Sequence, residues 1–385
     1  MLRLNPSALR IRQAVAARMT AHMSSKQFGT SVALQDSESS MMFEEVGQAG
    51  VATMNRPKVL NSLNLDMVVE MKKQFDEWEG DAQKKVIVLQ GAGGKAFCAG
   101  GDVVHIAKAG LAGDRTVAHE FFSTEYKLNS LIGRLRTPFV ALIDGITMGG
   151  GVGVSVHGRY RVATEKTLFA MPETAIGLVP DVGGGHFLPR LKGELGMYLA
   201  LTGNRLKAAD VYHAGLATHY VPKDQLTDLT ADLVSVENEE DVEVVLNKYH
   251  VTPDTPFSLD AHLNDIDRCF AGDKAEDMLA LLNDSGEWGR KNAKTIEKMS
   301  PTSVKVTIRQ LRNGAGLSLD GDLQMELRIC AETMRNKDFY EGIRALLIEK
   351  TNDPKWTPAT LAEVTKEMVD KHFVMLPAEL ELKIE

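Results

Sequence analysis

Three acidic residues are the side chains of this chain best placed for acid–base chemistry. Glu173 and Asp181 each come directly after a proline, which fixes φ and holds their backbones stiffly. Glu125 falls on the apolar face of a predicted helix, and burial of a carboxylate raises its pKa unless the charge is paired. The residues therefore predict acids in a partly dry pocket. The alternative is structural: Glu173 and Asp181 would cap nearby N–H groups, and Glu125 would reach water from the helix edge.

Two glycine-rich loops could supply the complementary hydrogen-bond donors. They read FCAGGD at 97–102 and GITMGGGVGVSVHG at 145–158. Each follows an apolar, β-branched run, at 86–90 and 139–143, and each leads into a segment that can be helical. Backbone N–H groups at the start of a helix are unpaired, and glycine lets them approach a ligand closely. Together the loops predict an oxyanion hole, whereas either loop alone is equally well explained as a tight turn.

An oxyanion hole combined with carboxylates suits chemistry at an activated acyl group such as a thioester. Each preorganised donor typically stabilises the developing oxyanion by about 2.7–4 kcal/mol, and a carboxylate then acts as base or nucleophile. A serine hydrolase is not indicated, because the motif G-x-S-x-G is absent. GAGGKA at 91–96 fits G-x-G-x-x-A, but it continues into the first glycine loop instead of opening a helix. It therefore does not predict a dinucleotide site.

The composition is that of an ordinary soluble globular protein. The chain has 385 residues, of which 44% are hydrophobic and 25% charged, and no apolar run reaches the length of a membrane span. Its net charge of −8 argues against nucleic acid as the main partner. Cys98, Cys269 and Cys330 are spaced neither as a disulfide framework nor as a zinc site, so a reducing compartment fits best.

The N-terminal segment, residues 1–35, differs from the rest of the chain. It carries five basic residues and no acid, is rich in Ser and Ala, and is weakly amphipathic. This pattern is typical of a mitochondrial transit peptide. The alternative is a disordered N-terminal tail, and a secretory signal is not indicated because a continuous apolar stretch is missing.

The remaining sequence predicts an α/β core followed by a mostly helical region. A hairpin is expected over 46–57, with its turn at Gln48–Gly50, and apolar spacing predicts helices over 64–81 and 119–135. The alternation of strand and helix patterns indicates a core over 42–235. The segment 236–385 reads mostly as helix.

Several long motifs resemble the crotonase (enoyl-CoA hydratase/isomerase) superfamily, and more closely its 3-hydroxyisobutyryl-CoA hydrolase branch. The motifs are FCAGGD, MGGGVGVSVHG, FAMPETAIGLVPDVGGG, NRPKVLNSLN, MSPTSVKVTIRQL and DFYEGIRALLIEKTNDPKW. The resemblance spans about residues 43 to 375. It implies a spiral of ββα units that binds acyl-CoA, with the helical region at its C-terminal end.

The resemblance also implies the roles of individual residues. The thioester oxygen would be held by the backbone N–H groups of Gly101 and Gly150. The CoA portion would lie along Arg56 and Lys58 and along the backbone of the segment from Lys95 to Ala99.

One departure from the hydratase pattern separates the two branches. The first catalytic glutamate of hydratases would fall at Gly153, and glycine cannot transfer a proton. The second glutamate is present as Glu173, which the hydrolase branch pairs with an aspartate, here Asp181. Glu125 matches a third acid that contacts the substrate. Glu173 would attack the carbonyl or activate water, and both routes are open. Neither a metal nor a cofactor is expected, because CoA is part of the substrate.

The activity implied is hydrolysis of 3-hydroxyisobutyryl-CoA, with 3-hydroxypropionyl-CoA as a further candidate, in valine breakdown in the mitochondrial matrix. Two alternatives remain. One is enoyl-CoA hydration or isomerisation through Glu173 alone, and the other is a non-catalytic acyl-CoA-binding or RNA-binding relative. An intact pair of Glu173 and Asp181 favours catalysis. The family often forms trimers, so a homo-oligomer is a candidate assembly, although the long C-terminal region could cover the surfaces that trimers use. Neither nucleic acid nor a membrane is an expected partner.

Overall fold

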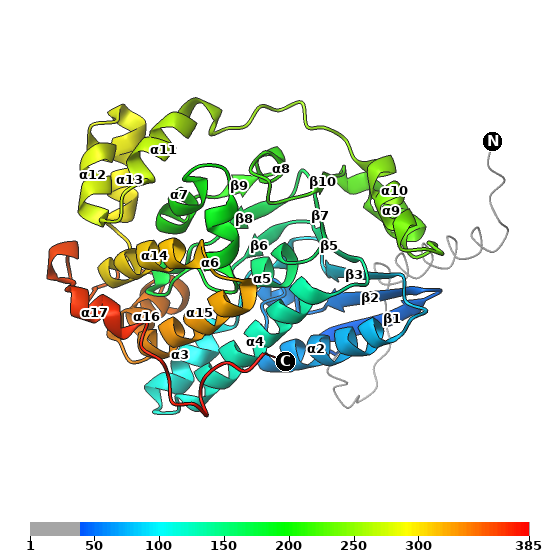
Figure 1. The fold of residues 1–385 in the computed structure, drawn as a ribbon, viewed down its shortest axis with the longest axis horizontal. Coiled ribbons are helices and arrows are strands. Elements are labelled where there is room, and N and C mark those ends of the chain that lie inside the picture. Colours follow the sequence, from blue (N-terminus) through cyan, green and yellow to red (C-terminus); the bar gives the residue numbers. More distant parts are fainter. Residues whose placement is uncertain (1–38, 385) are drawn as a thin grey trace, which may run out of the picture.

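The computed structural model describes residues 39–384, and the predicted transit peptide lies outside these residues. Two β-sheets form the centre of the fold (Figure 1). The first sheet has the order β1 (Met41–Val46), β2 (Ala49–Met54), β3 (Val86–Gly91), β5 (Phe139–Ile143), β7 (Tyr160–Ala163) and β10 (His219–Tyr220). The second has the order β4 (Ala96–Cys98), β6 (Ile146–Met148), β8 (Leu168–Ala170) and β9 (Leu206–Lys207).

The chain winds through these sheets as a spiral of strand–strand–helix units. The pairs β3–β4, β5–β6 and β7–β8 each place one strand in either sheet, and a helix follows each pair. Neighbouring strands from β2 to β10 in the first sheet, and from β4 to β8 in the second, run parallel. The α/β class and the spiral of ββα units are therefore confirmed.

Helices flank the two sheets (Figure 1). In the core region they are α2 (Leu65–Gly80), α3 (Val103–Leu111), α4 (Thr116–Arg134), α5 (Gly150–Val156), α6 (Gly184–Phe187), α7 (Leu195–Thr202), α8 (Ala209–His213) and α9 (Leu226–Leu233). The later ones are α10 (Glu240–Tyr249), α11 (Leu263–Phe270), α12 (Ala275–Asn283), α13 (Gly286–Ile296), α14 (Pro301–Gly314), α15 (Leu319–Thr333), α16 (Lys337–Ile343) and α17 (Lys366–Lys371). None of the helices between residues 39 and 384 is long and apolar enough to cross a membrane.

Local sequence accounts for most of these elements. The helix predicted over 64–81 is α2, whose N-cap Asn64 accepts a hydrogen bond from the backbone N–H of Met67. The predicted hairpin is β1 and β2, but its turn is residues 47–48, which begins one residue earlier than expected, and its first strand already begins at Met41. Gly47 takes the positive φ of 59°, while Gly50 stays in the strand because the Trp78 ring packs directly against it.

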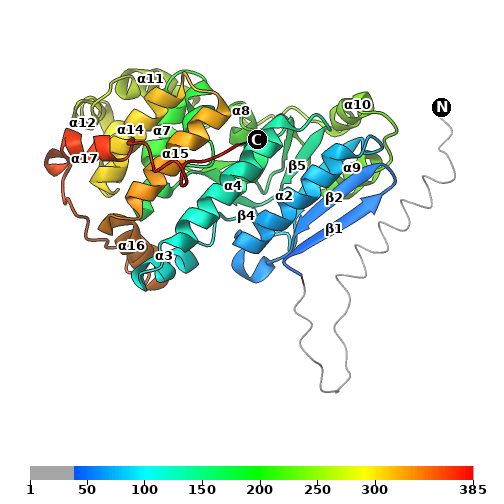
Figure 2. The ribbon, with the colours of Figure 1, turned by 60° about the horizontal axis from the view of Figure 1, so that its bottom comes forward.

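The helices after the last strand pack against the core on two sides. α9 and α10 cover one face of the first sheet, where they bury Leu229, Leu233 and Leu246 against its valines. On the other side, α15 lies against α4 (Figure 2). The domain boundary expected near residue 235 stays a prediction. What matters for the site is that α15, far along the chain, reaches the helix that carries Glu125.

Candidate active site

The three acids singled out in the sequence lie together in the interior. Glu125 comes from the middle of α4, Glu173 begins the 3-10 helix Glu173–Ile176, and Asp181 lies in the loop before α6. They are 2%, 5% and 4% exposed, respectively. Because all three side chains are buried, these are not surface acids that reach water.

The two predicted oxyanion amides face this cluster. Gly101 immediately precedes the N-cap of α3, and Gly150 is the first residue of α5. A side chain on Gly150 would begin 3.2 Å from the amide nitrogen of Gly101, and it would collide with Glu125 Oε1. Within residues 39–384 neither amide has a hydrogen-bond acceptor. The structure therefore places two free N–H donors side by side, next to an acid.

Glu173 lies on the adjacent side of the same amides. Its Oε1 is 2.9 Å from the position where a side chain on Gly149, the residue before the oxyanion amide, would begin. Glu173 Oε2 and Glu125 Oε1 are buried and have no hydrogen-bond partner among the described residues. Burial and the nearby charge of Asp181 raise the pKa of both glutamates well above the ordinary value. Unpaired buried oxygens of this kind require a polar ligand.

Asp181 differs from the two glutamates because it has a hydrogen-bond donor. The Tyr126 hydroxyl, on the same helix as Glu125, donates to Asp181 Oδ2 over 2.7 Å and also contacts the Cys330 thiol at 3.0 Å. Burial raises the pKa of Asp181 to about 6, and the hydrogen bond from Tyr126 opposes this rise. Asp181 is therefore the acid of the cluster that ionises most readily at neutral pH.

A glutamate of the C-terminal region holds the loop that carries Asp181. Glu326, from α15, accepts hydrogen bonds from the backbone N–H groups of Gly183 (2.7 Å) and Gly185 (3.0 Å). It also accepts one from Gln310 Nε2 at 3.0 Å. Glu326 is 0% exposed, and burial with the nearby Asp322 carboxyl raises its pKa. Helices of the C-terminal region thus fix the loop between Pro180 and α6.

The residues expected to bind CoA lie along one edge of the oxyanion loop. Lys58 and Lys95 are exposed, Arg56 and Ala99 are partly buried, and the four belong to two adjoining loops. Arg56 Nη2 is 3.3 Å from Asp102 Oδ2, directly after the oxyanion glycine. Two exposed lysines in the loops that flank the predicted oxyanion glycine suit the phosphates of CoA.

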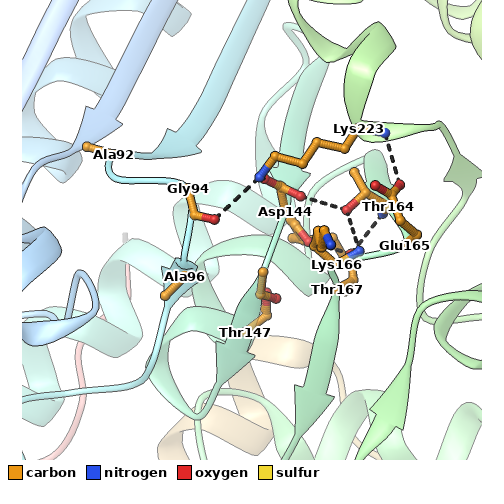
Figure 3. Close-up of polar contacts among 12 residues, drawn as sticks. Ala92, Gly94, Ala96, Asp144, Thr147, Thr164, Glu165, Lys166, Thr167 and Lys223 are labelled. Carbon is orange, nitrogen blue, oxygen red and sulfur yellow. Dashed lines mark hydrogen bonds and ion pairs between the residues drawn. The ribbon is translucent and has the colours of Figure 1, made fainter. Parts of the chain in front are cut away.

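The loop before the oxyanion glycine is tied to the rest of the core by two polar side chains. Asn61 Nδ2 donates to the carbonyl oxygen of Ala96 over 2.9 Å. Figure 3 shows Lys223 reaching Gly94 and Asp144 together, with Nζ at 3.3 Å from the Gly94 carbonyl oxygen and 2.6 Å from Asp144 Oδ2. These contacts hold the loop at the carboxyl end of β5, so the oxyanion amide is preorganised.

The position of the missing hydratase glutamate is filled by other atoms. A side chain on Gly153 would begin 2.5 Å from Val182 Cβ and 3.0 Å from Asn129 Nδ2. Val182 adopts a φ of 54°, which is rare for a β-branched residue, and it follows Asp181 directly. The loop that presents Asp181 therefore occupies the space that an acid at 153 would need.

Four residues around the acids are not identified by the sequence reasoning: Tyr126, Asn129, Glu326 and Cys330. A signal exists for three of them. Tyr126 and Asn129 are polar residues within the buried part of the helix that carries Glu125. Glu326 likewise interrupts the buried residues of α15. Only their contacts across the fold, however, identify them as part of the site.

Comparisons with known proteins identify the family of this chain. A family model described as enoyl-CoA hydratase/isomerase matches residues 49–373. The curated 3-hydroxyisobutyryl-CoA hydrolase, mitochondrial, of Danio rerio is 48% identical over 374 residues, which cover 95% of each protein. The Homo sapiens protein of the same name is 49% identical over 348 residues, covering 89% of this chain and 90% of the relative.

Two solved structures are also similar to this chain over most of their length. A carnitinyl-CoA dehydratase from Mycobacterium thermoresistibile has a TM-score of 0.85 and 39% identity, covering 90% of this chain and 99% of that one. An enoyl-CoA hydratase from Rhodobacter sphaeroides 2.4.1 has a TM-score of 0.82 and 34% identity, covering 90% and 100%. The chain therefore belongs to the enoyl-CoA hydratase/isomerase family of the crotonase superfamily.

Proposed function

We propose that this protein hydrolyses the thioester of 3-hydroxyisobutyryl-CoA to the free hydroxy acid and CoA, with 3-hydroxypropionyl-CoA as a further substrate. The observation that carries the proposal is the pair of free amides at Gly101 and Gly150 facing buried Glu173 and Asp181, with Gly153 in place of a second glutamate. The names of relatives that are 47–50% identical support this acyl group.

The reaction begins with the thioester oxygen between the two amides. As the carbonyl carbon becomes tetrahedral, the N–H groups of Gly101 and Gly150 stabilise the negative charge on this oxygen. Glu173 acts on the carbon, either by attacking it to form a mixed anhydride or by activating a water molecule. In both routes the C–S bond breaks and the sulfur leaves with a proton as the CoA thiol, and in the first route water then hydrolyses the mixed anhydride and frees Glu173. The new oxygen of the hydroxy acid comes from water.

The protonation states of the acids divide the work between them. With a pKa of about 6, Asp181 is mostly ionised at neutral pH and orients or deprotonates the attacking water. Burial and the charge of Asp181 raise the pKa of Glu125 well above its ordinary value, which favours the protonated form that donates a hydrogen bond to the substrate. The pKa of Glu173 is raised in the same way, so Glu173 has to lose its proton before it attacks the carbonyl or activates water. Acid and base roles thus follow from different environments of similar groups.

Hydration or isomerisation of enoyl-CoA is the main competing activity. Hydration by two glutamates requires an acid where Gly153 lies, and Val182 occupies that space. A purely binding protein would have no need for three buried acids with raised pKa values, since burying them is costly. The net charge of −8 likewise speaks against RNA as a ligand.

The proposal extends to the setting of the enzyme. We place it in the mitochondrial matrix, in valine breakdown, because the relatives carry the word mitochondrial in their names. The reaction as written uses neither cofactor nor metal, so chelators should leave the rate unchanged. Acyl-CoA is the proposed partner, with neither nucleic acid nor a membrane involved. Sedimentation would show whether the protein forms a homo-oligomer.

The experiment that tests the function is release of CoA thiol from 3-hydroxyisobutyryl-CoA by the full chain. Glu173→Gln serves as the variant that lacks the key acid, and we expect its rate to fall by at least about a thousandfold. Hydration of crotonyl-CoA is measured beside it. Hydration without thiol release would replace the proposal by the hydratase alternative, and binding without either reaction would replace it by the binding protein.

A further inference from the structure

One buried polar side chain beside the acids has no partner in the part of the chain that the structure describes. Asn129 lies on α4, one turn after Glu125, and is 0% exposed. Neither its Oδ1 nor its Nδ2 has a hydrogen-bond partner between residues 39 and 384. Leaving a buried amide unpaired is costly, so such groups in folded proteins are nearly always paired. An unpaired amide next to an active site therefore indicates a polar ligand.

The Asn129 amide faces the short helix whose first residue supplies an oxyanion donor. Its Nδ2 is 3.0 Å from the point where a side chain on Gly153 would begin. Gly153 follows Gly150 by three residues, which corresponds to about 4.5 Å along a helix. Glu125 faces Gly150 in the same way, and its Oε1 is also unpaired among the described residues. Helix α4 thus presents Glu125 beside Gly150 and, one turn later, the Asn129 amide on the side of Gly153.

We propose that Asn129 binds the 3-hydroxyl group of the acyl chain and thereby selects 3-hydroxyacyl thioesters over thioesters without this hydroxyl. The inference rests on the proposed function, which it deepens. A hydroxyl group both donates and accepts a hydrogen bond, and the Asn129 amide offers a carbonyl oxygen and an NH₂ group in return. The hydroxyl is carried by the second carbon beyond the carbonyl carbon. With the carbonyl oxygen at Gly101 and Gly150, we place the hydroxyl next to the Asn129 amide on α4, because Val182 fills the space directly beside Gly153.

A neutral amide also suits the charge of this pocket better than another acid would. Burial and the nearby charge of Asp181 already raise the pKa of Glu125 and of Glu173. A fourth carboxyl group would add to this repulsion. The amide instead supplies donors without charge, so a hydroxyl can be held while Asp181 stays ionised.

The test compares 3-hydroxyisobutyryl-CoA with isobutyryl-CoA, which differs only by the hydroxyl group. We expect Asn129→Leu to lower kcat/KM for the hydroxylated thioester by about 10-fold to 100-fold, because a buried hydroxyl is left unpaired. The kcat/KM for isobutyryl-CoA should stay within about twofold, since it makes no such hydrogen bond. Asn129→Ala repeats the measurement in case the leucine variant does not fold.

The matched control is Ser130→Ala, one residue further along the same helix. Ser130 is also 0% exposed, but its hydroxyl donates a hydrogen bond to Asp320 on α15 and does not contact the active-site acids. This control should keep the wild-type preference between the two thioesters. Equal losses on both thioesters in the Asn129 variants, or an unchanged preference, would overturn the inference.

Failure of the proposed function has a separate signature. If the wild-type protein releases CoA from neither thioester, the function fails, and calorimetric binding of the same two thioesters then decides about Asn129. Tighter binding of 3-hydroxyisobutyryl-CoA that disappears in Asn129→Leu supports the role of the amide. Equal binding of both thioesters by the wild-type protein refutes it.

Discussion

Replacing Tyr126 by phenylalanine should shift the pH dependence of hydrolysis. The Tyr126 hydroxyl donates to Asp181 Oδ2 over 2.7 Å, and both residues are buried. This hydrogen bond favours the ionised form of Asp181, whose pKa is about 6 because burial opposes ionisation more strongly. Phenylalanine fills nearly the same volume, so the change removes the donor and leaves the packing of α4 in place.

The size of the shift follows from the strength of this hydrogen bond. A hydrogen bond to a charged group contributes about 1.5–3 kcal/mol, and one pKa unit corresponds to about 1.4 kcal/mol, so the pKa of Asp181 should rise by about one to two units. Activity requires the ionised acid, so the rate falls as pH drops through this pKa. At pH 6.5 we expect a loss of about 3-fold to 25-fold, and at pH 9 less than about 2-fold.

The assay is CoA release over pH 5 to 9, with kcat/KM plotted for both proteins. Glu125 and Glu173 titrate together with Asp181, so the acid limb belongs to the cluster, and the difference between variant and wild type isolates Tyr126. Tyr198→Phe is the matched control, because Tyr198 is buried in α7 among aromatic rings away from the acids. An acid limb that does not move, or a loss of equal size at every pH, would refute the reasoning.

Three further predictions concern Asp181 itself and two residues that contact the loop carrying it. Asp181→Asn should abolish hydrolysis yet stabilise the fold by about 3 kcal/mol at pH 8 in urea unfolding. The pKa of Asp181 in the folded state is about 6, above the ordinary 3.8, so the free energy of unfolding falls as pH rises from 3.8 to 6 and stays lower above pH 6. An asparagine carries no charge and removes this loss. Gly153→Glu should give no crotonyl-CoA hydration. It should also lower the free energy of unfolding by about 1–3 kcal/mol, because Val182 Cβ lies 2.5 Å from the new Cβ. Measurable hydration by this variant would contradict the prediction. Glu326→Gln should lower kcat by about 10-fold or more with a smaller change in KM. The new NH₂ group would face a backbone N–H group of Gly183 or Gly185 that now donates a hydrogen bond to Glu326. An unchanged kcat would show that this glutamate does not position the loop.

The sequence predicts the parts of the site that depend on neighbouring residues. Glycine turns follow short apolar strands at Gly101 and Gly150, and both become helix starts in the structure. The burial of Glu125 is visible because helical periodicity places it among apolar residues. The hairpin turn is the local element that is misplaced, since Gly50 serves to let Trp78 pack and Gly47 forms the turn.

The sequence by itself therefore determines the set of chemical groups. These are two glycine loops, three acids, and Gly153 at the position where a further glutamate would lie in a hydratase. Each follows from local backbone preferences or from a contiguous motif. The tertiary structure alone decides how these groups are tuned. Tyr126 meets Cys330 204 positions away, and Glu326 holds a loop more than 140 positions before it. Such contacts depend on how α15 packs against α4, and no local pattern encodes the packing of distant helices.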